Sequence, residues 1–185
     1  MTQILTGAAS TIPGYSSLPP FDISKPLSII HYLQARGWEY GLGCKFVDIA
    51  ASPPQGHDYM GRYGGGDVDR VDCSGLARYM VNQATGGIVA PDGSSAQNDY
   101  CAAQGFKHHS HDEYLTNMGA GYLYWCFCRA GSRGETIGHT WLAWKHSDGR
   151  FWTAESHGGS GPDVRPASTP ILTEIVTDFY TVAKI

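Results

Sequence analysis

Apolar residues recur at helical spacing in two stretches of the N-terminal half of the chain. The first runs over residues 25–36, where Ser24 is a candidate N-cap, Pro26 suits a first helical turn and Gly37 ends the pattern. The second follows the stretch "VDCSGL" and ends at Gly86; its apolar face consists of Leu76, Ala77, Met80, Val81 and Ala84. The spacing predicts a helix over residues 25–36 and a second helix that begins at or just after Cys73.

A third helix and a set of strands follow. Ser94 and Gln97 have the spacing of a capping box, and Gly105 closes that segment. Later stretches are rich in aromatic and β-branched residues, which favour strands; they cover residues 122–128, 139–145, 150–156 and 174–183, with the turn "HSDG" between the middle two. Because helices come first and strands joined by short turns follow, the expected fold class is α+β with an antiparallel sheet.

Two segments lack such periodicity. Residues 1–22 are rich in Ser, Thr, Gly and Pro, which predicts an extended or disordered arm. Residues 51–70, "ASPPQGHDYMGRYGGGDVDR", predict a long loop, and a loop of that length in a compact domain is usually functional or disordered. With 185 residues, 42% of them apolar, one substantial core is expected, so residues 23–185 are predicted to form a single domain.

Charge and hydropathy exclude several classes of partner. The net charge is −4 and the chain has no basic block, which argues against nucleic acid and against an anionic membrane surface. No apolar run is long enough to span a bilayer, and the N-terminus lacks the basic and apolar regions of a signal peptide. We therefore expect no membrane insertion and synthesis in the cytoplasm without a signal peptide.

The chain contains five cysteines without the regular spacing of a disulfide scaffold: Cys44, Cys73, Cys101, Cys126 and Cys128. This odd set fits synthesis in a reducing compartment and predicts at least one free thiol. Cys73 is the candidate nucleophile, because a thiol at a helix N-terminus lies near the positive end of the helix dipole, which favours the thiolate. The alternative is that Cys73 only packs in the core, as free cysteines often do.

A nucleophilic cysteine needs a base that is close in the fold. His139 follows Gly138 and opens a predicted strand, which would hold its ring on rigid backbone. The other histidines are less well placed: His108, His109 and His111 are expected to be solvated in a polar loop, His31 lies in the first helix and His146 lies at a turn. His139 is therefore the predicted base, although a lone histidine is more often structural.

A third group must accept a hydrogen bond from the second imidazole nitrogen. The strand "FWTAES" is expected to pair with the His139 strand, so a polar side chain on it can lie across from His139. Thr153, Glu155 and His157 share one face of that strand, and Glu155 is the only carboxylate among them. Glu155 is the preferred third residue, with His157 and Thr153 as alternatives.

In this order, the motifs resemble the NlpC family of papain-like cell-wall cysteine peptidases. "WEYGLG" resembles the family's aromatic-glycine entry, "VDCSGL" its cysteine motif, "APDGSSAQ" its Ser and Gln segment, "GAGYLYW" its Gly-Asp-Leu strand and "GHTWLAW" its histidine strand. The match covers residues 25–160 approximately. The chain departs from the pattern at Tyr122, which replaces the aspartate, in "APDG", which lacks an arginine that often follows the proline, and in the long loop before Cys73.

The resemblance implies a papain-like fold, with N-terminal helices packed on a C-terminal antiparallel sheet, and hydrolysis of peptidoglycan. Cys73 would attack an amide of the stem peptide, typically the bond between D-glutamate and a diamino acid, and His139 would move the proton. The Tyr40 hydroxyl would join the Cys73 N–H in stabilising the oxyanion, and Asp72 and Ser74 would contact the amino end of the stem peptide. The form "ESHGGSG" resembles the glutamate-containing version seen in phage lysins, which supports Glu155.

The resemblance also implies a setting. A wall hydrolase without a leader would be delivered to the cell wall by a phage holin, as an endolysin, or by a secretion system, as an antimicrobial toxin effector with an immunity protein as its partner. Two alternatives stay open: an acyltransferase or deamidase of the same fold that acts on a protein, and a binding module without catalysis.

Other features have ordinary explanations. Cys126 and Cys128, with "HHSH", could suggest zinc, but paired zinc cysteines usually have two residues between them, so core packing is expected and neither a metal nor a cofactor is predicted. The tryptophans of the predicted strands are expected in the core. "RYGGGDVDR" lacks the Lys and Ser or Thr of a phosphate loop, so no nucleotide site is predicted.

Overall fold

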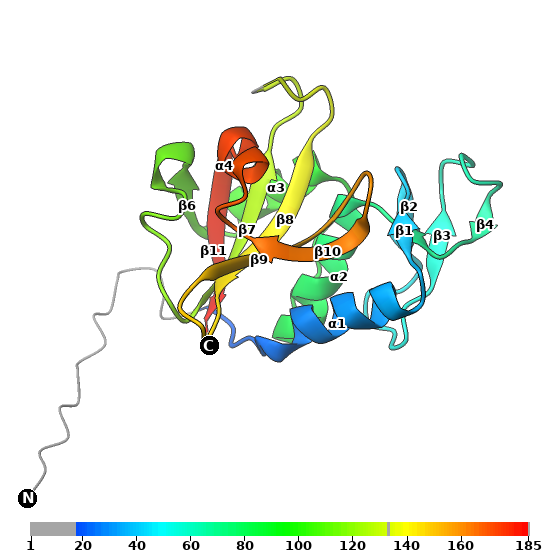
Figure 1. Ribbon diagram of the computed structural model, residues 1–185, viewed down its shortest axis with the longest axis horizontal. Coiled ribbons are helices and arrows are strands. Elements are labelled where there is room, and N and C mark those ends of the chain that lie inside the picture. Colours follow the sequence, from blue (N-terminus) through cyan, green and yellow to red (C-terminus); the bar gives the residue numbers. More distant parts are fainter. Residues whose placement is uncertain (1–17, 133, 185) are drawn as a thin grey trace, which may run out of the picture.

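A six-stranded antiparallel sheet forms the centre of the protein (Figure 1). The computed structural model describes residues 18–132 and 134–184. The sheet has the strand order β10-β9-β8-β7-β11-β6. Its strands are β6 (Lys107–Ser110), β7 (Tyr122–Cys128), β8 (His139–Lys145), β9 (Phe151–His157), β10 (Gly161–Pro166) and β11 (Asp178–Lys184). The predicted mixture of helices with an antiparallel sheet is therefore confirmed.

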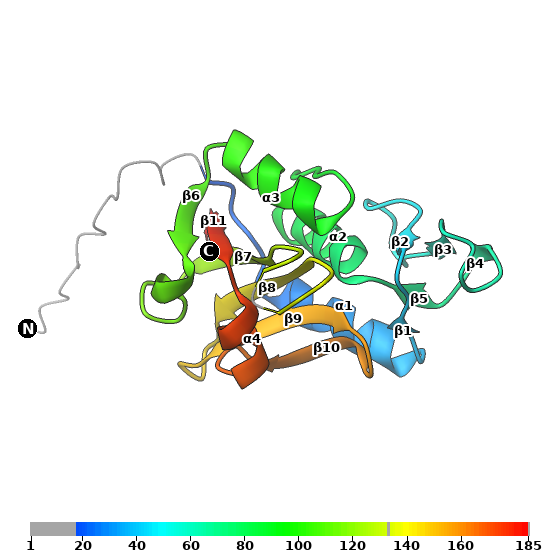
Figure 2. The same cartoon turned by 90° about the horizontal axis from the view of Figure 1, so that it is seen from above.

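Helices lie on both faces of this sheet (Figure 2). They are α1 (Ser24–Ala35), α2 (Cys73–Thr85), α3 (Ser94–Ala103) and α4 (Pro170–Ile175), with a 3₁₀ turn at His111–Glu113. One hydrophobic cluster joins α1, α2 and α3 to the face that carries Trp125, Leu142 and Ala154. The second cluster joins α4 to the opposite face, which carries Trp141 and Phe179. Both faces are apolar because strand side chains alternate and the central strands are covered on each side.

Short strands close the end of the molecule next to the start of α2 (Figure 1). A two-stranded parallel pair consists of β1 (Glu39–Tyr40) and β5 (Arg70–Val71). A three-stranded sheet consists of β2 (Cys44–Phe46), β3 (Gly56–Asp58) and β4 (Gly66–Asp67). The stretch 51–70, predicted to be a loop, thus holds three short strands, and Asp58 orders the turn after β3 by accepting hydrogen bonds from the N–H groups of Met60, Tyr63 and Gly65.

The second helix matches its prediction. It begins at Cys73, Asp72 is its N-cap, and Gly86 ends it in the left-handed conformation with φ of 67°. The first helix begins one residue earlier than expected, and Ser24 is not its cap: the carboxylate of Asp22 accepts hydrogen bonds from the Ser24 N–H and hydroxyl. Ser24 is therefore the first residue of the helix, and it donates hydrogen bonds to Asp22.

Three other local predictions are wrong. No capping box forms at Ser94, because Gly93 is the N-cap and the Gln97 amide instead donates to the backbone carbonyls of Ser74 and Pro91. The capping box forms at Ser110–Glu113. The predicted strand over residues 174–183 begins only at Asp178, because its first two residues complete α4. His109 is not solvated: it lies on β6, 1% exposed, stacked on Phe179.

The predicted arm is described only from residue 18. Residues 1–17 lie outside the described part of the chain. Leu18 and Phe21 are buried, and the segment pairs with the end of β11 through a Phe21 N–H to Lys184 carbonyl bond of 2.9 Å. Residues 18–22 therefore lie extended along the domain.

Candidate active site

The start of α2 places the Cys73 thiol beside the main sheet. Asp72 accepts a hydrogen bond from the Gly75 N–H at 2.8 Å, which satisfies one of the free donors of the first helical turn. The Ser156 hydroxyl on β9 donates to the Val71 carbonyl at 2.7 Å. The first contact fixes the start of the helix and the second ties the residue before it to the sheet, so both set the position of Cys73. Cys73 is 7% exposed.

The imidazole of His139 lies at the first position of β8. Cys73 is its neighbour, since hydrogen bonding to Cys73 and the negative charge of Cys73 are among the causes that raise the pKa of His139. Gly138 precedes His139, and a Cβ at this glycine would lie 2.6 Å from the Ser94 hydroxyl and 3.3 Å from the Cys128 carbonyl. Glycine therefore lets the start of α3 approach the start of β8, and the His139 ring stacks on Trp141 with centroids 5.5 Å apart.

Glu155 is the group that holds the other side of the ring. Its Oε2 lies 2.7 Å from His139 Nε2, and the carboxylate is fully buried. Because Nε2 is taken by Glu155, Nδ1 is the ring nitrogen left for Cys73. The two alternatives lie elsewhere: the Thr153 hydroxyl donates to the Arg165 carbonyl, and the His157 ring bonds with Ser160.

The pKa values follow from these contacts. Burial alone would lower the pKa of His139, but the hydrogen bonds and negative charges of Cys73 and Glu155 raise it from 6.5 to about 10. Burial alone would raise the pKa of Glu155, but the bonds and charges of His139 and Arg165 lower it below its ordinary value. The geometry thus favours a charged imidazole next to a charged Glu155 carboxylate.

The other cysteines have different surroundings. All five thiols are free, and all are buried. Burial raises the pKa of Cys44, of Cys101 and of Cys126 above the ordinary value for a thiol. Cys126 and Cys128 belong to the hydrophobic cluster under α4, as the core-packing interpretation expected.

Tyr40 lies near the thiol because β1 pairs in parallel with β5, which places Tyr40 opposite Val71. Burial raises the pKa of Tyr40, and the negative charges of Cys73 and Asp72 raise it further. The phenol therefore stays protonated and can donate a hydrogen bond beside Cys73.

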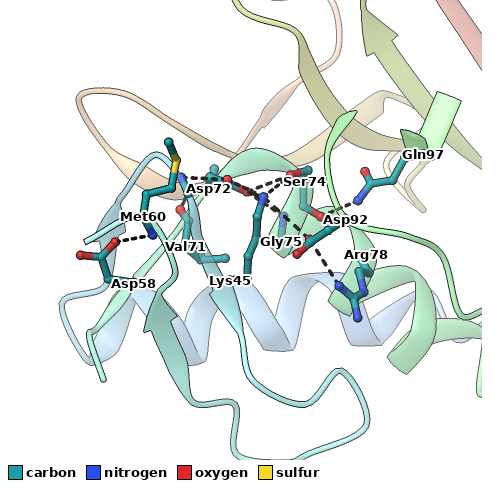
Figure 3. Close-up of polar contacts among 12 residues, drawn as sticks. Lys45, Asp58, Met60, Val71, Asp72, Ser74, Gly75, Arg78, Asp92 and Gln97 are labelled. Atoms are coloured by element: carbon teal, nitrogen blue, oxygen red, sulfur yellow. Dashed lines mark hydrogen bonds and ion pairs between the residues drawn. The ribbon is translucent and has the colours of Figure 1, made fainter. Parts of the chain in front are cut away.

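Asp72 and Ser74, which flank the cysteine, lie in a buried polar cluster (Figure 3). Lys45 Nζ on β2 lies 2.6 Å from Asp72 Oδ1 and also bonds the Ser74 hydroxyl. Asp72 further accepts from the Gly43 N–H at 3.1 Å. Both side chains thus build the start of α2, and their contact with a peptide stays a prediction.

A cavity of about 270 Å³ opens next to His139. Its wall includes Tyr40, Gly138, His139, His157 and Arg165, with the apolar side chains of Ile137, Ile171 and Ile175. A second cavity of about 340 Å³ is lined by Ser94, Asn98 and Arg129, and Gly138 is part of its wall as well. Gly138 therefore lines both cavities, next to the start of β8.

Two residues of the site were not predicted from the sequence. Arg165 donates from Nε to Glu155 Oε1 at 2.6 Å, and Lys45 holds Asp72. Arg165 lies on a strand that contains two prolines, and Lys45 lies on a strand of three residues, so no periodic pattern marks either one. Among the described residues, no group of three or more metal-ligating side chains is placed to bind a metal ion, and no helix has the length and hydropathy to cross a bilayer.

Similarity to known proteins is found at the level of three-dimensional structure. No protein-family model matches the chain, and no curated protein matches it. Among solved structures, the chain is similar to a protein of Staphylococcus aureus subsp. aureus Mu50 described as "similar to lipoprotein, NLP/P60 family". The sequence identity is 15% and the TM-score is 0.48; the match covers 92% of this chain and 45% of that one. The chain therefore spans less than half the length of this neighbour.

Proposed function

We propose that this protein is a cysteine hydrolase of peptidoglycan that cleaves an amide bond in the stem peptide, between D-glutamate and a diamino acid. The contact of His139 with both Cys73 and Glu155 is the observation that supports catalysis. The ordered motifs around Cys73 and His139 support the choice of substrate, because they resemble cell-wall peptidases with a papain-like fold.

The reaction uses the thiolate as nucleophile. Cys73 Sγ bonds to the amide carbon, and the negative charge moves to the carbonyl oxygen. That oxygen accepts hydrogen bonds from the Cys73 N–H, one of the free donors at the start of α2, and from the Tyr40 hydroxyl. The C–N bond then breaks, and the leaving amine takes the proton from His139 Nδ1, which leaves a thioester on Cys73.

Water completes the cycle. Neutral His139 removes a proton from the water that attacks the thioester carbon, and the C–S bond breaks to regenerate the Cys73 thiolate and the charged imidazole. Glu155 keeps the ring oriented through both steps by its bond to Nε2, as the third member of a triad does.

The test compares cysteine variants on purified sacculi of different chemotypes. We expect Cys73→Ser to lower the release of soluble fragments by about 1000-fold or more, since it removes the nucleophile. Cys101→Ser is the matched control, because Cys101 is also a free, buried thiol but lies on α3 in the hydrophobic cluster. Undiminished lysis by Cys73→Ser would overturn the assignment.

Mass spectrometry of the products separates the proposed hydrolysis from its alternatives. Hydrolysis adds one water to the cleaved peptide, whereas acyl transfer does not. Iodoacetamide separates it from a binding module, because a reactive thiolate is labelled rapidly near neutral pH and a packed thiol is not. Delivery by a phage holin or a secretion system, and an immunity partner for a secreted toxin, stay predictions.

A further inference from the structure

We propose that Arg165 is a positioning residue of this site, which acts on Cys73 and His139 through Glu155. The inference rests on the proposed function and extends it to a residue outside the cysteine, histidine and carboxylate triad. Its basis is a continuous chain of contacts from the thiol to the guanidinium.

Glu155 has one charged donor on each oxygen. His139 Nε2 lies 2.7 Å from Oε2, and Arg165 Nε lies 2.6 Å from Oε1. Because the carboxylate is fully buried, water does not compete for either oxygen. The orientation of the carboxylate, and with it that of the imidazole, is therefore fixed from both sides.

The sheet register explains how Arg165 reaches Glu155. In the β9–β10 ladder Asp163 pairs with Glu155 and Arg165 pairs with Thr153. Arg165 is thus the diagonal neighbour of Glu155 on the same face, a distance that only a long side chain spans. The Arg165 side chain is 21% exposed, and the residue lines the cavity next to His139. Arg165 therefore forms part of the cavity wall at the site.

Charge alternates along this chain of contacts: Cys73 thiolate, His139 cation, Glu155 anion, Arg165 cation. A buried carboxylate with a single partner would either take up a proton or draw the proton of His139 more strongly. Arg165 opposes both effects, because a guanidinium is always charged and offsets part of the carboxylate charge. His139 can then release its proton to the leaving amine more easily.

The neighbourhood contains few other charges. Cys126 on β7 and Tyr114 after the 3₁₀ turn lie near Glu155, and burial raises the pKa of both, so they stay neutral. The remaining titratable groups around the site and its cavity are Tyr40, Asp72, Cys73, Glu135, His157 and Asp163. Besides His139, Arg165 is the cation that is bonded to Glu155.

The test measures pH profiles of Arg165→Gln and Arg165→Lys. Arg150→Gln is the matched control, because the Arg150 side chain pairs with Asp148 on the exposed turn before β9. One readout is kcat/KM on a synthetic stem peptide; the other is the rate of Cys73 alkylation by iodoacetamide. Removing a cation raises the pKa of every neighbouring group, so we expect both profiles of Arg165→Gln to move to higher pH by about one unit. On the acid limb this is about a tenfold loss at fixed pH.

Arg165→Lys keeps the charge, so its profiles should stay nearer to those of the wild type, and Arg150→Gln should superimpose on the wild type. A double-mutant cycle with Glu155→Gln completes the design: if Arg165 acts through Glu155, adding Arg165→Gln to Glu155→Gln costs little more. Profiles of Arg165→Gln that only lose amplitude, or effects of the two variants that add in full, would overturn the inference.

The two readouts keep this inference separate from the proposed function. A wild type that cleaves no stem peptide refutes the hydrolase, while its alkylation profile still decides whether Arg165 controls the thiol. An active wild type whose profiles are matched by those of Arg165→Gln refutes the role of Arg165 alone.

Discussion

His139 is the residue on which the site depends. Its ring lies between the helix that carries Cys73 and the strand that carries Glu155, and it is hydrogen-bonded to Glu155. His139 contributes to stability in addition to its proposed catalytic role, because Cys73 and Glu155 raise its affinity for a proton in the folded state only. The two contributions have the same physical origin.

A pH dependence of stability follows from this. The pKa of His139 is raised from 6.5 to about 10 on folding, so between these values the folded protein binds the proton more tightly than the unfolded chain does. The resulting stabilisation is present in full below pH 6.5 and is lost as the pH rises through about 10. We expect the free energy of unfolding of the wild type, relative to His139→Gln, to fall across this window.

Urea denaturation of the wild type and of His139→Gln measures the difference in their free energies of unfolding. It is carried out below pH 6.5, near pH 10 and at a pH between these two values. A difference that stays constant with pH would show that His139 does not gain its proton affinity on folding.

At the scale of elements, the start of α2 depends on the contacts of one side chain, Asp72. Asp72 caps the helix at the Gly75 N–H, a buried contact, and pairs with Lys45 from β2 in a partly buried one. The Asp72 side chain thus holds the start of α2 and connects the small sheet β2-β3-β4 to it. The sequence motif around Cys73 therefore has a structural role in addition to its proposed catalytic one.

Asp72→Ala should therefore be costly. It removes the cap and leaves the Lys45 ammonium without its main partner, and we expect a loss of about 3 kcal/mol in the free energy of unfolding. Asp72→Asn keeps an acceptor for the Gly75 N–H and should cost less. The measurement is urea denaturation followed by circular dichroism.

Asp69→Ala is the control in this experiment, because Asp69 lies exposed in the same segment and uses its backbone carbonyl to bind the Glu39 N–H. An Asp72→Ala variant no less stable than Asp69→Ala would contradict the structural role of the buried cluster.

At the scale of the whole molecule, the two hydrophobic clusters share their strands. β7, β8 and β11 send alternate side chains to the α1–α2–α3 face and to the α4 face. Unfolding of either cluster disrupts these strands and so exposes the apolar side chains of the other cluster as well. We therefore expect the two faces to unfold together.

Urea transitions followed by tryptophan fluorescence and by far-ultraviolet circular dichroism should superimpose. Trp141 reports the α4 face, and Trp125 and Trp144 report the opposite face. A Trp141→Phe variant whose fluorescence transition departs from its circular dichroism transition would indicate that the faces unfold separately, against the prediction of a single domain.

Local signals determined much of this fold. The aromatic-rich runs that became β7 and β8 have the predicted bounds, because a continuous apolar run of about seven residues favours a strand buried on both faces. β10, with two prolines, and β6, with two histidines, were missed. Both are edge strands of the main sheet, where proline is tolerated and where pairing with one neighbour is enough to order a polar segment.

By itself, the sequence determined the helix that starts at Cys73, the strand that starts at His139 and the preference for Glu155, since caps, periodicity and short turns act over a few residues. Only the tertiary structure decided that Glu155 and neither Thr153 nor His157 bonds His139, that Asp72 and Ser74 face Lys45, and that Arg165 completes the chain of charges. These contacts join residues far apart along the chain, and their geometry depends on strand register and helix packing, which no local pattern encodes.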